Sequence, residues 1–211
     1  MSPGKTFQPT VIFIIWISSG LILLLIALRI CVMGVVYVQS ESMQPNIHKA
    51  DGIIVNHLAY GINVPFSDSL IYQWRLPHRG EIVTFRNPHD DGMLWMKRVI
   101  GLPGDTLEFR EHILYLDGIN IQQSNKNIEM IPTQQAGTQN NILNYKIWHS
   151  YLEDDWGPVT ITEDHLFLMG DNRGNSLDSR SWGMLHSRYL QGEASLRFWP
   201  LERLGWIQKK P

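Results

Sequence analysis

The chain has 211 residues, of which 44% are hydrophobic and 18% are charged, and its formal net charge is −2 at pH 7. This length allows one sizeable buried core, so one main domain is expected. The slightly acidic balance, without long lysine or arginine runs, excludes nucleic acid as the main partner. The one cysteine, Cys31, excludes an internal disulfide, and the fold must be held by packing.

The first predicted element is an apolar helix near the N-terminus. Residues 11–28 contain no charged side chain, and a helix of that length spans roughly 27 Å, close to the ~30 Å hydrocarbon layer of a bilayer. We expect a transmembrane anchor at residues 11–29 after a short tail at residues 1–10. A cleaved signal peptide, with a shorter apolar run, and a buried core helix are the alternatives. Lys5 and Arg29 flank the segment, so charge does not decide its orientation.

The remainder, residues 30–211, predicts a mainly β domain of several short, mostly antiparallel strands. Its apolar or alternating runs end at Gly, Pro, Asp or Asn, which is typical of strands bounded by turns. We find no convincing amphipathic helix after the N-terminal one. A polar insertion at about 119–157, rich in Asn and Gln, predicts a surface hairpin or loop. The expected strands lie within residues 30–38, 52–55, 80–85, 94–100, 112–116 and 165–169.

Several familiar catalytic patterns are absent from the sequence. There is no His-Glu-x-x-His motif and no Cys/His cluster, so we expect no metal and no cofactor. There is no Gly-x-Ser-x-Gly motif either. A Ser-His-Asp triad stays open, because its members meet only in space.

A lysine offers another possible base. In a strand, Lys97 shares one face with Trp95 and Val99, and burial among apolar groups lowers the pKa of an amine. A lysine that acts near neutral pH needs a pKa well below ~10.4. The alternative is an edge-strand lysine that reaches into solvent.

Residues 170–183 gather Asp, Asn, Ser and Arg in one short stretch. Such a stretch is typical of a capped surface loop. Two aspartates and two arginines within it could equally form a paired network that stiffens an active-site wall.

Together these segments resemble type I signal peptidases, the membrane-bound Ser-Lys endopeptidases that remove signal peptides. The Ser-x-Ser-Met-x-Pro pattern that begins at Ser40 resembles the nucleophile box of that family. Residues 120–157 have no counterpart, and Gly174 stands where the family often has an acidic residue. The other matching segments follow in family order at residues 51–55, 79–85, 97–105, 170–180, 192–194 and 198–201.

The resemblance implies a role for each matching residue. Ser42 would be the nucleophile and Lys97 the general base, with Ser176 hydrogen-bonded to the lysine to orient it. The Ser40 hydroxyl and the Ser42 backbone N–H would bind the oxyanion, and Met43 would line the substrate pocket. Supporting roles near the site would fall to Arg98, Asp171, Asp178 and Arg180.

The resemblance also implies the biological setting. The partners would be precursor proteins with signal peptides, cut after small residues of the Ala-x-Ala type, and the lipid bilayer. The chain would be a single-pass protein of the cell (inner or plasma) membrane, with its catalytic domain on the extracytoplasmic side. Trp199 and Trp206 could pack in the core or touch the lipid interface.

Three other functions remain open at the level of sequence. One is a dedicated maturation peptidase for a pilin-like or conjugation-system substrate. Another is an inactive anchored domain that binds signal peptides or partners. SOS repressor autoproteases share the Ser-Lys chemistry, but they pair it with a DNA-binding domain and lack an anchor.

Overall fold

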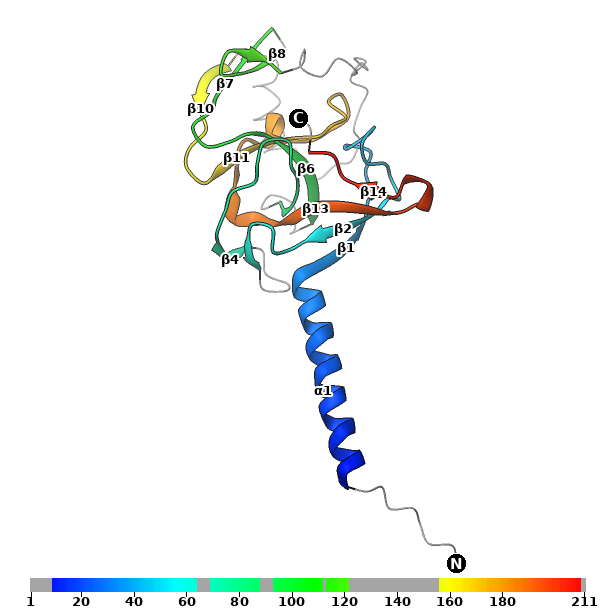
Figure 1. The fold of residues 1–211 in the computed structure, drawn as a ribbon. Helices are drawn as coiled ribbons and strands as arrows, with labels where there is room; N and C mark the ends of the chain where they lie inside the picture. Colours follow the sequence, from blue (N-terminus) through cyan, green and yellow to red (C-terminus); the bar gives the residue numbers. More distant parts are fainter. Residues whose placement is uncertain (1–8, 64–68, 88–92, 112, 122–155, 210–211) are drawn as a thin grey trace, which may run out of the picture.

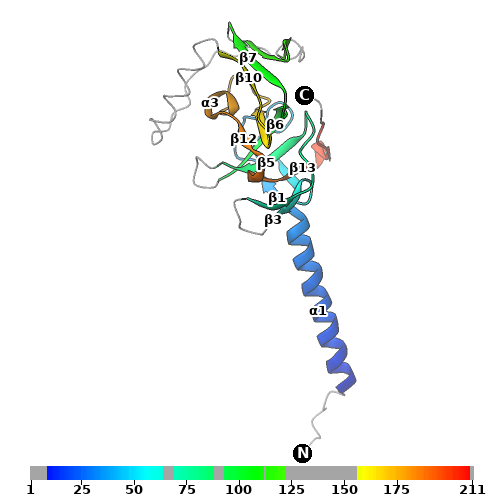
Figure 2. The same ribbon diagram turned by 90° about the vertical axis from the view of Figure 1, so that its left-hand side faces the viewer.

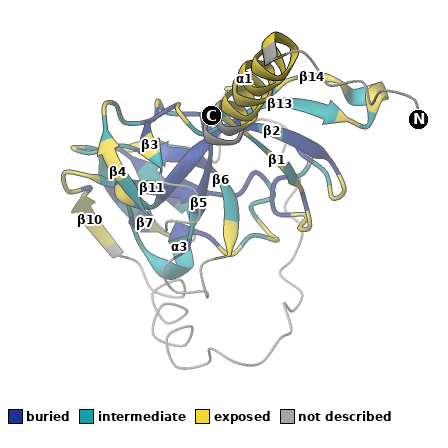
Figure 3. Ribbon diagram, turned by 90° about the horizontal axis from the view of Figure 1, so that it is seen from below, coloured by how far each residue is buried: buried dark blue, intermediate teal, exposed yellow. Residues whose placement is uncertain are grey.

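The computed structural model describes residues 9–63, 69–87, 93–111, 113–121 and 156–209. Helix α1 (Pro9–Val32) projects from one end of a β domain in both views (Figures 1 and 2). Apolar side chains from Val11 to Ile26 are exposed along α1, whereas the central strands are buried (Figure 3). Within the described ranges, no helix meets the length and apolarity required to cross a membrane.

The helix passes into the β domain without an intervening loop. Strand β1 (Met33–Tyr37) starts at the residue after α1 ends, so the expected strand at residues 30–38 was placed too early. Apolar residues without proline or glycine continue the helix up to Val32. The His57 N–H donates to the Val32 carbonyl at 2.9 Å. A Cβ at Gly34 would collide with the His57 ring, so glycine permits this close joint.

The largest sheet has eight strands and carries the expected site. Its order is β1-β2-β13-β5-β6-β11-β12, with β14 paired to β13, and every pairing is antiparallel. The strands after β1 are β2 (Gly52–Asn56), β5 (Ile82–Arg86), β6 (Leu94–Gly101), β11 (His165–Met169), β12 (Leu185–His186), β13 (Leu190–Trp199) and β14 (Gly205–Trp206).

The described residues also form two smaller sheets. A four-stranded sheet has the order β10-β7-β8-β9, and a two-stranded sheet joins β3 and β4. The strands are β3 (Gly61–Asn63), β4 (Leu70–Gln73), β7 (Thr106–Arg110), β8 (Ile113–Leu116), β9 (Ile119–Asn120) and β10 (Trp156–Thr160). In the part of the chain that the structure describes, short helices are α3 (Ser179–Trp182), η1 (Ser187–Tyr189) and η2 (Leu201–Arg203).

The mainly β, antiparallel prediction is confirmed, with one large omission. The expected strands at residues 52–55, 80–85, 94–100 and 165–169 correspond to β2, β5, β6 and β11. The longest strand, β13, was not expected, because polar residues such as Glu193 interrupt its apolar pattern. The central part of the polar insertion, residues 122–155, lies outside the described residues.

Candidate active site

The expected nucleophile, Ser42, lies in a turn that is anchored by neighbouring apolar residues in the core. After β1 the chain turns through Ser42, and the Ile47 N–H donates to the Met43 carbonyl at 2.9 Å. Met43 is 1% exposed and Ile47 is 0% exposed, and both pack in an apolar cluster with Ile53 and Val55. Ser42 is left at the edge of this cluster, 8% exposed. The Met43 side chain is therefore part of the core, and its expected role in lining a substrate pocket stays a prediction.

Strand β6 places Lys97 against this turn. The Lys97 side chain is 4% exposed, and its Nζ donates to the Ser42 Oγ at 2.8 Å. The Ser40 and Ser42 hydroxyl oxygens are 3.1 Å apart. The expected serine and lysine therefore meet, although 55 positions separate them in the chain.

Burial sets the acidity of the lysine. The pKa of Lys97 is lowered from 10.5 to about 8, mainly by desolvation; Arg180 also acts to lower it, while Asp178 and Asp171 act to raise it. A substantial fraction of the amine is thus uncharged in weakly alkaline solution. An uncharged amine near a hydroxyl can accept its proton.

The loop after β11 packs directly on the nucleophile turn. The Asn172 N–H donates to the Ser42 carbonyl at 3.0 Å. A Cβ at Gly170 would lie 2.5 Å from that carbonyl and would also collide with Ser176, so only glycine allows this approach. The Ser176 hydroxyl is buried without a hydrogen-bond partner. The expected hydrogen bond from Ser176 to Lys97 is therefore not formed in this structure.

A buried ion pair lies next to the lysine on β6. Arg98 is 2% exposed, and its Nε and Nη2 each donate to an Asp171 carboxylate oxygen at 2.6 Å. The Arg98 Nη1 donates to the carbonyls of Gly80, at 2.7 Å, and Gln208, at 3.0 Å. The Asn46 amide donates to Asp171 at 2.9 Å. One carboxylate thus joins the nucleophile turn to the lysine strand.

A second buried carboxylate stabilises the loop itself. Asp178 is 0% exposed and accepts from Arg180 Nε at 2.8 Å and from the Gly170 N–H at 2.9 Å. Burial opposes the charged form of Asp178, but Arg180 and the hydrogen bonds hold its pKa below the usual range. Of the two aspartates and two arginines in residues 170–183, Asp178 and Arg180 pair with each other, whereas Asp171 pairs with Arg98 of β6. The stretch is therefore a buried, paired network in part, and its role in an active-site wall stays a prediction.

Comparison with known proteins identifies the family. A sequence model described as signal peptidase, peptidase S26, matches residues 11–199. The chain belongs to this signal peptidase family. Signal peptidase I of Pseudomonas aeruginosa is 32% identical and the match covers 90% of this chain and 69% of that protein. Signal peptidase I P of Bacillus subtilis subsp. natto is 31% identical, and the match covers 90% of each chain.

A solved structure gives a weaker similarity in shape. The crystal structure of a signal peptidase I from Enterococcus faecalis V583 is 26% identical, with 57% of this chain and 98% of that chain covered and a TM-score of 0.36. Family membership confirms the resemblance drawn from the sequence boxes, and the chain is a serine endopeptidase of the signal peptidase family.

Three contacts of this signal peptidase site were not expected. Asn46, Asn172 and Gln208 reach Asp171, Ser42 and Arg98 respectively. Position was a signal for Asn46 and Asn172, which stand just beyond or within a segment that resembles the family, whereas Gln208 follows the last such segment at a distance and gave no signal. Two of the three contacts use backbone atoms, which carry no residue-type signature.

Proposed function

We propose that this chain removes signal peptides from exported precursor proteins, with Ser42 as nucleophile and Lys97 as general base. The observation that carries the proposal is the 2.8 Å distance between the Lys97 Nζ and the Ser42 Oγ. The low exposure of the amine supports the base role, because burial favours the free amine that can accept a proton.

The proposed reaction begins with proton transfer. The Lys97 Nζ takes the Ser42 proton while the Oγ attacks the scissile carbonyl carbon. The oxyanion is stabilised by the Ser42 backbone N–H and the Ser40 hydroxyl, a role that the 3.1 Å separation of the two hydroxyl oxygens supports. Lys97 then protonates the leaving amine, and water hydrolyses the acyl-enzyme. We assign Arg98, Asp171, Asp178 and Arg180 to positioning, and Ser176 to orientation of the lysine once it rotates into contact.

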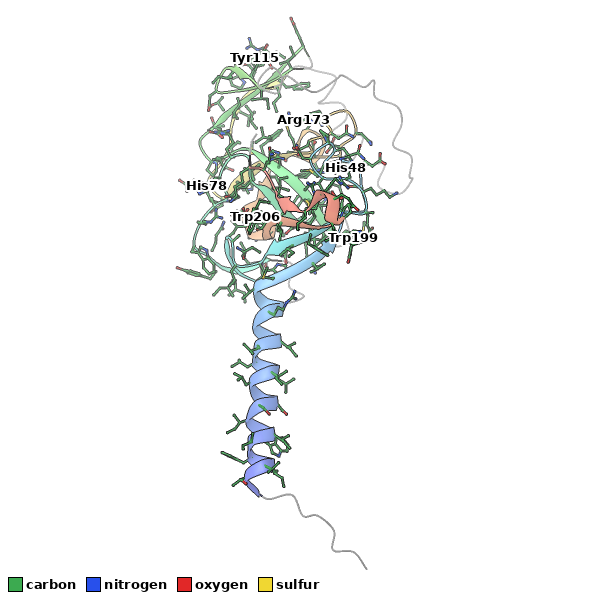
Figure 4. The ribbon with its side chains drawn as sticks, turned by 45° about the vertical axis from the view of Figure 1, so that its right-hand side comes forward. His48, His78, Tyr115, Arg173, Trp199 and Trp206 are labelled. Atoms are coloured by element: carbon green, nitrogen blue, oxygen red, sulfur yellow. The ribbon has the colours of Figure 1, made fainter. Side chains whose placement is uncertain are left out.

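We further propose that α1 anchors the chain in the cell membrane as a single pass, with the β domain on the extracytoplasmic side. The helix contains 24 residues, about 36 Å at 1.5 Å per residue, and its apolar side chains are exposed. Trp199 is 51% exposed and Trp206 is 78% exposed, which contradicts core packing for both (Figure 4). Indole rings favour the lipid interface, so these two residues are proposed to contact it.

The test is cleavage of a secretory precursor by the purified full-length chain in detergent. We expect Ser42→Ala and Lys97→Ala to lose at least about a thousandfold in kcat/KM while remaining folded. The wild-type rate should rise with pH through about 8, because the free amine is the reactive form. Undiminished cleavage by either variant would refute the dyad.

Substrate choice requires a separate measurement. We propose cleavage after small side chains at the first and third positions before the bond, as the family resemblance implies. A panel of precursors with Ala, Ser, Leu or Phe at those positions should show cleavage of the small residues only. Cleavage of one pilin-like substrate, with all general precursors left intact, would instead support the dedicated maturation peptidase.

A further inference from the structure

An aromatic ring lies beside the proposed base. The Lys97 Nζ is 5.5 Å from the centroid of the Trp95 ring, within the ~6 Å range at which an aromatic face attracts a cation. The two residues are two positions apart on β6 and so share one face of the strand. Trp95 is opposite Phe85 in the β5–β6 register, and the two ring centroids are 6.4 Å apart. The indole is therefore held in place by the sheet.

The charge on Lys97 changes within the proposed reaction. As the Ser42 Oγ forms its bond to the carbonyl carbon, its proton moves to the Nζ lone pair and the C=O π electrons move to oxygen. The amine is then an ammonium ion, until it donates the proton to the nitrogen that leaves when the C–N bond breaks. Because Lys97 is 4% exposed, water contributes little to stabilising this transient cation.

We propose that the face of the Trp95 indole stabilises the ammonium ion that Lys97 forms during acylation. This inference rests on the proposed function, because it requires Lys97 to be the base. The ring adds no net charge, in contrast to the charged groups of the loop after β11. Among those, Asp178 and Asp171 favour the ammonium form and Arg180 opposes it, while β5 places apolar Val83 opposite Lys97.

The inference is tested by weakening the attraction of the ring face in a series of nearly equal side-chain volume, with Trp95→Phe as the reference. Trp95 is replaced by phenylalanine and by phenylalanines with one, two or three ring fluorines, in the full-length chain in detergent. The kcat/KM for a fluorogenic signal-peptide substrate is then measured against pH, since its acidic limb reports the base in the free enzyme. We expect the limb to move stepwise to lower pH, by about half a unit to one unit in total, and the plateau to fall several-fold.

Trp182 provides the matched control. Its ring also contacts Phe85, with centroids 5.8 Å apart, so the same series there tests general packing effects. We expect no movement of the limb in that series. A limb that stays fixed through the Trp95 series, or that moves equally in both series, would overturn the proposed role.

Two further substitutions distinguish attraction by the ring face from the exclusion of water from the amine. Trp95→Leu keeps an apolar cover without a ring face and should move the limb to lower pH. Trp95→Ala admits water to the amine and should move the limb to higher pH. If Lys97→Ala is inactive but the acidic limb does not move in the Trp95 series, only this inference is refuted. If Lys97→Ala remains active, the proposed function itself is refuted.

Discussion

The eight-stranded sheet and the four-stranded sheet place their charged side chains in opposite environments. Arg98 on β6 is 2% exposed and pairs with Asp171, which is 7% exposed. Arg110 on β7 is 52% exposed and pairs with Glu108, which is 29% exposed. A charge persists in the interior only where other groups hold it, since desolvation opposes it. Burying Arg98 of the larger sheet together with Asp171 therefore costs desolvation free energy, and in return the pair positions groups around Ser42.

The smaller sheet is held in a simpler way. Leu107 and Leu114 are 0% and 1% exposed, and they pack with Ile100 and Phe167 from the larger sheet. Apolar burial of this kind needs no partner of specified charge. Charged residues on this sheet should thus be replaceable, whereas those beside the site should not.

The largest expected effect comes from breaking the buried pair. Arg98→Met leaves the Asp171 carboxylate buried with only partial compensation from Asn46, so we expect unfolding in urea to require roughly 3–5 kcal/mol less. Cleavage activity should fall as well, because Asp171 joins the nucleophile turn to β6. The double variant Arg98→Met with Asp171→Leu should recover most of the stability but not the activity. A single variant as stable as wild type would show that the pair is not structurally important.

Removal of the buried amine should have the opposite effect on stability. Burial lowers the pKa of Lys97 from 10.5 to about 8. Between these two pH values the unfolded chain binds a proton that the folded chain does not, so wild-type stability rises with pH in this window. Below it, the folded chain bears the full cost of charging the amine, roughly 3 kcal/mol.

We therefore expect Lys97→Met to be inactive but more stable than wild type at pH 7, by up to roughly 3 kcal/mol. The gain should disappear as the pH rises through the window. Denaturant unfolding at several pH values measures this difference, with Lys49→Met, at an exposed position, as the control that should show no such trend. Equal destabilisation at every pH would contradict the buried uncharged amine.

The smallest expected effect is on the four-stranded sheet. Arg110→Ala removes the ion pair with Glu108 at 3.1 Å and the contact with the Tyr115 ring at 4.5 Å. Exposed pairs of this kind contribute about 0.2–1 kcal/mol. We expect a loss within this range and unchanged cleavage, measured by the same unfolding and activity assays. A loss as large as that of Arg98→Met would remove the contrast between the two sheets.

The sequence predicts a strand well where a local apolar run coincides with the buried strand. Strand β11 was expected because His165–Met169 is a short apolar run before a glycine. Strand β13 was not predicted, because its polar side chains have partners distant in the sequence, as Glu193 does with Lys209 at 2.5 Å. Periodicity reports which face is buried, but it cannot report a charge that is buried with its partner.

The site shows the same limit. Ser42 and Lys97 were found through resemblance, and their contact is as expected. The Ser176 hydroxyl was expected to hydrogen-bond to Lys97 but is buried without a partner, and the sequence pattern does not fix the distance between these two side chains. The Asn46 contact with Asp171 joins residues 125 positions apart, which no local pattern can reveal.

The loop-free joint between α1 and β1 has a mechanical consequence. The His57 N–H donates to the Val32 carbonyl, and a side chain at Gly34 would collide with the His57 ring, so the end of α1 is tied to the residue that follows β2. Under the proposed anchoring of α1, a joint without a loop leaves no flexible linker that could change the distance between the bilayer and Ser42.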